Sequence, residues 1–236
     1  MHRDSCIAEL AAAILAIGHD HPVRVAIDGV DGVGKTTLAD ELVGPTRQFG
    51  REIIRASVDG FHHPRRRRYA RGADSPEGYF VDSFDHDALK RELLEPLGPG
   101  GTRRYRRAVF NYRVDAPVNA SAEEAQANAI LLFDGVFLLR PELRAYWDFA
   151  IWVDAPFSVT VHRAVHRDAA DDTHLEAVRD SYERRYVPGQ RIYLSRCRPI
   201  EHADIVLNNA DFANPKLRYR ARSGAVKQPD AADRRR

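Results

Sequence analysis

The feature that most constrains this chain is a glycine-rich loop between an apolar stretch and an amphipathic one. Residues 29–36 have the sequence Gly-Val-Asp-Gly-Val-Gly-Lys-Thr and match the pattern G-x-x-x-x-G-K-[ST]. This pattern predicts a phosphate-binding loop (P-loop), because its glycines let backbone N–H groups turn toward phosphate oxygens and the following helix adds the positive end of its dipole. Lys35 is expected to reach the terminal phosphates of a nucleotide, and the Thr36 hydroxyl is expected to contact Mg²⁺.

The residues on either side of the loop provide the context that the motif requires. Residues 23–28 are apolar and β-branched, which predicts a buried strand, and residues 37–43 carry apolar side chains at helical spacing. Strand, glycine loop and helix therefore follow one another in the order of a P-loop. The predicted site for ATP or another nucleoside triphosphate comprises Gly29, Val30, Asp31, Gly32, Val33, Gly34, Lys35, Thr36 and Thr37.

Strand-like and helix-like segments alternate along the rest of the chain. Strands are expected at residues 52–58, 129–133, 149–153 and 203–207, and helices at residues 4–18, 87–95, 157–168 and 173–186. Residues 60–84 look irregular, and residues 103–118 suggest a small hairpin or an extended excursion. The alternation predicts an α/β fold, with a central, mostly parallel sheet in a three-layer sandwich.

Composition narrows the class of protein. The 236 residues carry a net charge of +2, and the two cysteines, Cys6 and Cys197, are expected to be reduced rather than paired. There is no apolar run of about 18 residues and no signal-peptide pattern, so we expect a cytoplasmic protein without a membrane segment. Arginines cluster at residues 65–68 and 103–107, but acidic residues follow each cluster, which makes nucleic-acid binding unlikely.

Two carboxylates follow predicted strands. Asp59 comes directly after residues 52–58, and Asp134 ends the apolar run 130–133. The carboxyl ends of parallel strands meet at one edge of a sheet, so both side chains should lie near the P-loop. There Asp59 could accept the proton of an attacking hydroxyl, although a simple turn residue is the alternative, and Asp134 could anchor Mg²⁺.

Two arginines lie four residues apart on the helix expected at 157–168. Arg163 and Arg167 should therefore share one face of that helix. One or both could contact the phosphoryl group during its transfer. The alternative is a solvated helix face on which they pair with Asp168 and Asp171.

Motifs beyond the P-loop carry a resemblance to a known family. The chain resembles the uridine kinase and phosphoribulokinase branch of P-loop small-molecule kinases, and it is most similar to the uridine kinase-like proteins of bacteria. The segments that carry the resemblance are residues 27–37, 57–62, 82–86, 132–137 and 203–206. The Ser-x-Asp-x-Phe and Phe-Asp-His blocks are more specific than the P-loop, which many NTPases share.

The resemblance implies roles for individual residues. It implies ATP-dependent phosphorylation of a nucleoside 5′-hydroxyl, with Mg²⁺ held by Thr36, Asp134 and Asp59, and with Asp59 as base and Lys35 and Arg167 as further catalytic residues. It assigns the ribose hydroxyls to Asp85. The acceptor site expected from these motifs consists of Phe61, His62, Phe84, Asp85, Phe110 and Tyr112. For Phe110 and Tyr112 the alternative is core packing in a half-buried strand. Arg163 is expected at the ATP site because it shares a helix face with Arg167.

The chain also departs from the family pattern. Asp115 falls where uridine–cytidine kinases have a histidine that contacts the pyrimidine, and Asp-Ala-Ala-Asp-Asp at 168–172 replaces the Glu-Arg-Gly-Arg of the lid. These departures leave open another small hydroxyl acceptor, such as pantothenate or a sugar phosphate. A regulatory switch protein that hydrolyses NTP slowly is a rival from another class, and the oligomeric state is left open.

The expected organisation is one kinase domain over residues 1–215. Within it, residues 60–118 would form an acceptor-site excursion and residues 163–190 a lid. Residues 216–236 are polar and arginine-rich, so we expect a disordered tail there.

Overall fold

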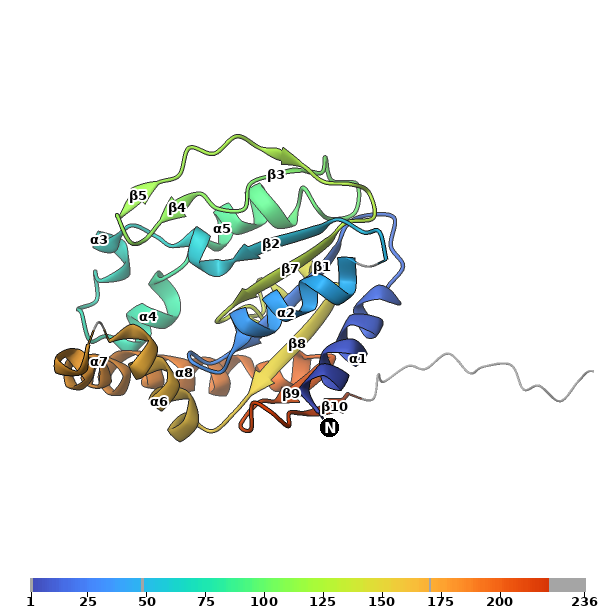
Figure 1. Ribbon diagram of the computed structural model, residues 1–236. Coiled ribbons are helices and arrows are strands. Elements are labelled where there is room, and N and C mark those ends of the chain that lie inside the picture. The colour runs from blue at the N-terminus through green and yellow to red at the C-terminus, as the bar shows by residue number, and fades with distance from the viewer. Residues whose placement is uncertain (1, 48, 170, 221–236) are drawn as a thin grey trace, which may run out of the picture.

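The centre of the molecule is a single six-stranded sheet in the order β10-β9-β8-β1-β7-β2 (Figure 1). The computed structural model describes residues 2–47, 49–169 and 171–220. Pairing between β9, β8, β1, β7 and β2 is parallel, and β10 is antiparallel to β9. The bounds of the strands are Val23–Gly29 (β1), Ile53–Ser57 (β2), Ile130–Gly135 (β7), Phe149–Asp154 (β8), Ile205–Asn208 (β9) and Lys216–Tyr219 (β10).

Helices cover both faces of the sheet. Helices α1 and α2 pack against each other on the face toward the viewer in Figure 1, and α8 lies behind β8. The bounds of the longer helices are Arg3–Leu15 (α1), Lys35–Arg47 (α2), Pro76–Asp82 (α4), Phe157–Asp168 (α6), Leu175–Ser181 (α7) and Val187–Cys197 (α8), and the short ones are Arg65–Arg68 (α3) and His86–Leu89 (α5). The prediction of an α/β fold with a central, mostly parallel sheet is confirmed.

Strands β1 and β7 lie in the hydrophobic core. Every residue of β1 and of β7 is buried, as expected for parallel strands with helices on both faces. Both cysteines are free and buried. Within the described ranges, no helix combines the length and the apolar character needed to cross a membrane.

Three expectations about local structure were wrong. The segment 60–84, expected to be irregular, contains α4, whose start is fixed by Ser75: its hydroxyl accepts the Gly78 N–H at 3.0 Å, and Pro76 occupies the first helical position. The helix predicted to end at residue 186 is followed directly by α8, so the helical run extends to Cys197. Residues 216–219 form β10 rather than part of a tail, because pairing with β9 satisfies their backbone, and residues 221–236 lie outside the described residues.

The excursion consists of two small pairs of strands. Strand β4 (Phe110–Asn111) pairs with β5 (Ala116–Pro117), which confirms a hairpin within residues 103–118. Strand β3 (Arg104–Tyr105) instead pairs with β6 (Glu123–Glu124), beyond the predicted segment. Figure 1 shows this excursion running past the β2 edge of the sheet.

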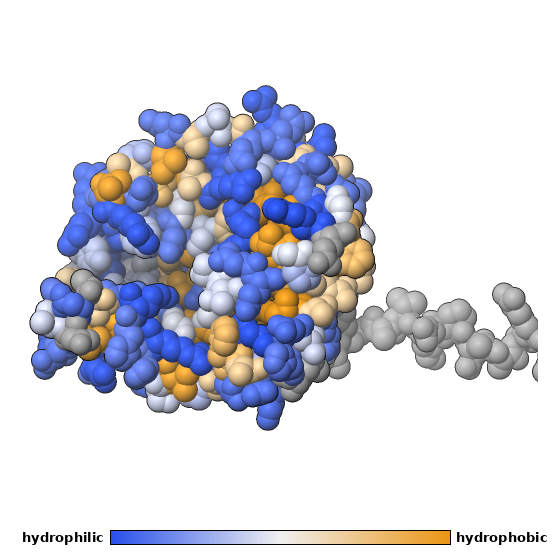
Figure 2. Space-filling view, viewed as in Figure 1, coloured by the Kyte–Doolittle hydropathy of each residue, from blue (hydrophilic) through white to orange (hydrophobic). Residues whose placement is uncertain are grey.

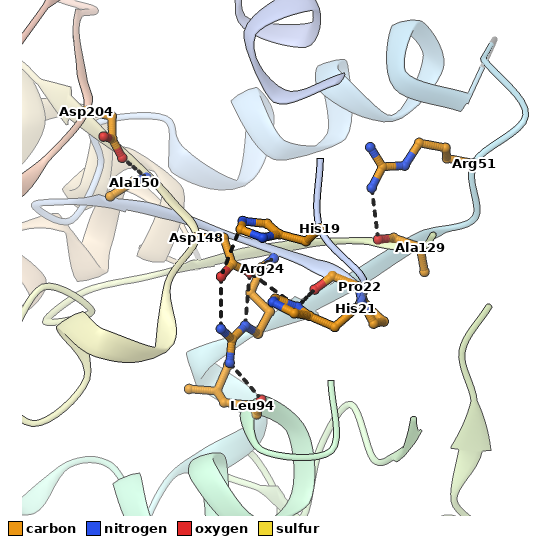
Figure 3. A network of polar contacts seen from close by, with 10 residues as sticks. All are labelled: His19, His21, Pro22, Arg24, Arg51, Leu94, Ala129, Asp148, Ala150 and Asp204. Carbon is orange, nitrogen blue, oxygen red and sulfur yellow. Dashed lines mark hydrogen bonds and ion pairs between the residues drawn. The ribbon is translucent and has the colours of Figure 1, made fainter. Parts of the chain in front are cut away.

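A buried ion pair closes the end of the sheet opposite to the P-loop (Figure 3). The Nε and Nη2 atoms of Arg24 donate to the two carboxylate oxygens of Asp148 at 3.0 and 2.9 Å, and its Nη1 donates to the Leu94 carbonyl at 3.2 Å. His19, His21 and Asp148 lie close enough together to hold a metal ion. Arg24 already engages both carboxylate oxygens, and His21 Nδ1 faces the Pro22 carbonyl at 2.9 Å, so we assign this cluster a structural role.

The replacement Asp148→Asn should destabilise the protein by about 3 kcal/mol, because it leaves the buried Arg24 guanidinium without its counter-charge. Urea unfolding at constant protein concentration would measure this loss. The matched control is Asp20→Asn, at an exposed position next to the cluster, which should leave the midpoint unchanged. Equal midpoints for the two variants would contradict the importance of the pair.

Candidate active site

The glycine loop joins β1 to α2 at the carboxyl edge of the sheet, and its conformation requires glycine at two positions. Gly32 has φ of 73°, and a Cβ atom there would lie 2.1 Å from the Thr160 carbonyl oxygen. Gly34 has φ of 98°, and a Cβ atom there would lie 2.8 Å from Asn209 Nδ2. Any other residue would push α6 or the segment after β9 away from the loop.

Buried polar groups hold the ends of the loop. Asp28, at the start, accepts hydrogen bonds from the Gly29 and Leu139 N–H groups at 2.7 and 3.0 Å and from the Tyr193 hydroxyl. Burial raises the pKa of Asp28 to about 6, against the lowering effect of these hydrogen bonds. The Asn209 amide donates to the Val33 carbonyl at 2.7 Å, so the segment after β9 supports the other end.

Lys35 lies at the start of α2 with its side chain folded back over the loop. Its ammonium group donates to the Val30 carbonyl at 2.8 Å. Burial lowers the pKa of Lys35, while the nearby charges of Asp31, Asp28 and Asp134 act in the opposite direction. A desolvated ammonium bound to one neutral carbonyl is well suited to engage phosphate oxygens.

Thr36 and Asp134 lie in hydrogen-bond contact. The Thr36 hydroxyl donates to Asp134 Oδ2 at 2.7 Å, and Arg55 Nη2 donates to Asp134 Oδ1 at 3.0 Å. Asp134 is buried near the end of β7, next to the loop. One hydroxyl and one carboxylate are the hard oxygen ligands that Mg²⁺ prefers, so these two residues fit the metal that the sequence predicts.

Asp59 lies in the short 3₁₀ turn Val58–Phe61 that follows β2. Its side chain lines the same cleft as Lys35, Thr36 and Asp134. The pKa of Asp59 is raised to about 6, mainly because the surrounding protein reduces the solvation of the carboxylate. The negative charges of Asp31 and Asp134 raise it further. The residue is nevertheless exposed, so a ligand in the cleft can reach it. A carboxylate with such a pKa is suited to proton transfer near neutral pH.

The cleft has a volume of about 950 Å³, and an aromatic wall borders the part of it near Asp59. The His62 ring lies between the rings of Phe84 and Tyr112, with centroid distances of 4.5 and 4.6 Å. Desolvation lowers the pKa of His62 to about 4, so this wall is uncharged at neutral pH. Figure 2 shows a hollow between the part of the molecule that carries α3 to β5 and the part that carries α6 and α7, with hydrophilic side chains along its border.

Three predicted acceptor-site residues lie elsewhere. Phe61 is fully buried against Phe133, and Phe110 is buried in β4. Asp85 caps α5 by accepting the Ala88 N–H at 2.9 Å, and its other oxygen lies 3.7 Å from His63 Nδ1. None of the three is among the residues that line the cleft.

Both predicted lid arginines line the cleft, but each already has protein partners. Arg163 donates to the backbone carbonyls of Asn209 and Ala210 at 3.0 and 2.9 Å. Arg167 pairs with Asp168 at 2.7 Å, and this contact raises the pKa of the guanidinium, which stays charged. Arg163 therefore anchors α6 to the segment after β9, and Arg167 is the more exposed of the two charges.

Comparison with known proteins identifies the family. Residues 25–211 match the model of the Phosphoribulokinase / Uridine kinase family. The chain belongs to this family. Uridine-cytidine kinase B of Dictyostelium discoideum is 26% identical over 191 residues, which cover 79% of this chain and 74% of the relative. The uridine kinase of Leuconostoc citreum is 25% identical over 188 residues, which cover 72% and 84%.

A solved structure agrees with the family in fold. The protein described as a possible uridine kinase from Bacillus stearothermophilus superposes with a TM-score of 0.68 at 24% identity, over 86% of this chain and 97% of that chain. Membership in the phosphoribulokinase/uridine kinase family supports a P-loop kinase of this type. At these identities, the acceptor is not carried over to this chain.

Several cleft residues of this family member were not found from the sequence. Tyr79, Arg113, Tyr182 and Tyr186 line the cleft, and the side chain of Asp31 does so as well, although only its place in the loop was predicted. The one available signal was the spacing of Tyr182 and Tyr186, four residues apart and hence on one helix face. The others come from segments whose approach depends on the tertiary fold.

Arg185 joins the two sides of the cleft. Its buried guanidinium donates to the carbonyls of Arg68, Gly72, Ala73 and Ser75 at 2.9 to 3.2 Å. It also lies over the Tyr69 ring, 4.5 Å from the centroid. The helical segment after α7 is therefore bound to the segment between α3 and α4.

Proposed function

We propose that this protein transfers the γ-phosphoryl group of ATP to the 5′-hydroxyl of a nucleoside. The observation that carries the proposal is one cleft that contains both a phosphate site, with Lys35 and Thr36, and a carboxylate, Asp59, whose pKa is raised to about 6. Phosphoryl transfer depends mainly on positioning and on charge neutralisation, and these groups supply both.

On the donor side, the loop N–H groups and Lys35 would hold the β- and γ-phosphates, with Arg167 near the transferred group. Thr36 and Asp134 would hold Mg²⁺, with Asp59 as a further ligand directly or through water. When bound, Mg²⁺ would neutralise negative charge on the phosphate oxygens. Arg55, which pairs with Asp134 at 3.0 Å, would keep that carboxylate oriented.

On the acceptor side, Asp59 would orient and deprotonate the attacking hydroxyl. The wall formed by His62, Phe84 and Tyr112 offers flat, uncharged rings against which a nucleobase can stack. The positions of Phe61, Phe110 and Asp85 do not support the acceptor roles that the resemblance implied, and those roles remain predictions.

Arg113 favours a second candidate acceptor. Its guanidinium lies 5.8 Å from the Tyr112 ring, and the residue lines the cleft. An exposed arginine there would suit an anionic hydroxyl compound, such as pantothenate or a sugar phosphate. The regulatory-switch alternative has no such support, because it gives the acceptor-side groups no role.

A panel of acceptors in an ADP-release assay with MgATP would test the proposal. Uridine and cytidine should stimulate ADP release over the rate with ATP alone and should appear as 5′-monophosphates by mass spectrometry. Pantothenate, fructose and a sugar phosphate complete the panel. Stimulation by an anionic compound alone would favour the second candidate, and no stimulation by any compound would favour the switch.

A further inference from the structure

The loop residue Asp31 has a side chain that is fixed by two other elements. The Tyr79 hydroxyl of α4 and the Gln190 amide of α8 donate to the same oxygen, Oδ2 of Asp31, at 2.8 and 2.7 Å. Gln190 is 2% exposed and Tyr79 is 7% exposed, so both donors are themselves held by packing. The carboxylate is therefore pre-oriented before any ligand binds.

The second carboxylate oxygen of Asp31, Oδ1, is left for a ligand. Asp31 lines the cleft, and within the described ranges no hydrogen bond or ion pair reaches its Oδ1. Two bonds to one oxygen leave the other as a fixed acceptor. The Gln190 side-chain carbonyl also accepts the Asp31 N–H at 3.3 Å, which fixes the backbone of the residue.

The place of Asp31 within the cleft indicates which ligand it meets. It lines the same cleft as Asp59 and Tyr182, and Tyr79, which binds its Oδ2, lines that cleft as well. A carboxylate repels phosphate oxygens and has no proton to donate to them. Its free oxygen is therefore suited to the uncharged hydroxyl groups of an acceptor.

We propose that Asp31 binds a hydroxyl of the acceptor other than the one that is phosphorylated, and that it thereby selects acceptors with several hydroxyl groups. For a nucleoside this hydroxyl is on the ribose ring. The inference rests on the proposed phosphoryl transfer and deepens it. Asp31 lines the cleft, and Asp85 is not among the residues that line it.

The test compares the wild type and a variant with substrates that differ by one hydroxyl group. Uridine, 2′-deoxyuridine and 3′-deoxyuridine are compared on the wild type and on Asp31→Asn. Asparagine keeps the size of the side chain and one oxygen for Tyr79 and Gln190, while the group at the Oδ1 position changes from an acceptor to a donor. The matched control is Asp4→Asn, at a side chain that is 92% exposed in α1.

We expect Asp31→Asn to lower kcat/KM for uridine by about 10- to 100-fold, the effect of one charged hydrogen bond. For the deoxynucleoside that lacks the bound hydroxyl, wild type and variant should be equal. The KM for ATP and the thermal midpoint should match those of Asp4→Asn. A variant that weakens all three nucleosides equally, or one that raises the KM for ATP instead, would overturn the inference.

Failure of the proposed function has a different signature, because the wild type itself would then not phosphorylate uridine. If another compound of the panel is phosphorylated, wild type and Asp31→Asn are compared with that compound and its deoxy analogues. A wild type that phosphorylates no compound of the panel overturns both proposals.

Discussion

Asp59→Asn should lower kcat by about 10²-fold or more, the usual loss when a general base is removed. Asparagine keeps the shape of the side chain but cannot take up the proton of the attacking hydroxyl. Binding of ATP, measured by calorimetry with a non-hydrolysable analogue, should stay close to that of the wild type. Near-normal turnover would contradict the assignment of Asp59 as the base.

The pH dependence provides a second test of Asp59. Its pKa is raised to about 6, so the carboxyl is protonated and inactive below that pH and ionised above it. For the wild type, kcat/KM should therefore rise with pH through about 6 and level off above about 7, since this parameter reports groups of the free enzyme. The residual activity of Asp59→Asn should not show this rise of kcat/KM with pH. If the variant shows the same rise, the titrating group is not Asp59.

Lys35→Ala should lower kcat by about 10² to 10³-fold, because one charged donor to the transferred phosphoryl group is lost. The pKa of Lys35 is lowered mainly by burial, so its charge is costly in the ligand-free protein and its removal should not reduce thermal stability. The KM for the acceptor should change little. Steady-state kinetics and a thermal melt would measure both effects.

The matched control for Lys35→Ala is Lys216→Ala, at an exposed position in β10. It removes the same charge from the protein far from the loop along the chain and should keep full activity. A Lys35 variant with the turnover of this control would exclude the lysine from the reaction.

The proximity of Lys35, Thr36 and Asp134 could be predicted from the sequence because it depends on local geometry and on the ends of buried strands. The P-loop places Lys35 and Thr36 within one turn of Gly34, and Asp134 is marked by the end of a buried strand. Parallel pairing of β1 and β7 then brings Asp134 to the Thr36 hydroxyl, at 2.7 Å. Hydrophobic pattern and strand order are sufficient for this result.

The rest of the cleft depends on contacts between distant segments. Tyr79 and Gln190 meet at Asp31 although they lie 111 positions apart in the sequence, and no local pattern indicates this contact. Phe61 and Asp85 illustrate the opposite case. Their motifs were recognised in the sequence, but Phe61 packs in the core against Phe133, and Asp85 caps α5.

The four hydrogen bonds from Arg185 to backbone carbonyls have a consequence for ligand binding. Because they join the helical segment after α7 to the segment between α3 and α4, a movement of one cleft wall on ligand binding would move the other wall as well. Occupation of the ATP site should then tighten binding of the acceptor, and the acceptor should tighten binding of ATP by the same factor. The protein would thus bind its two ligands as a pair.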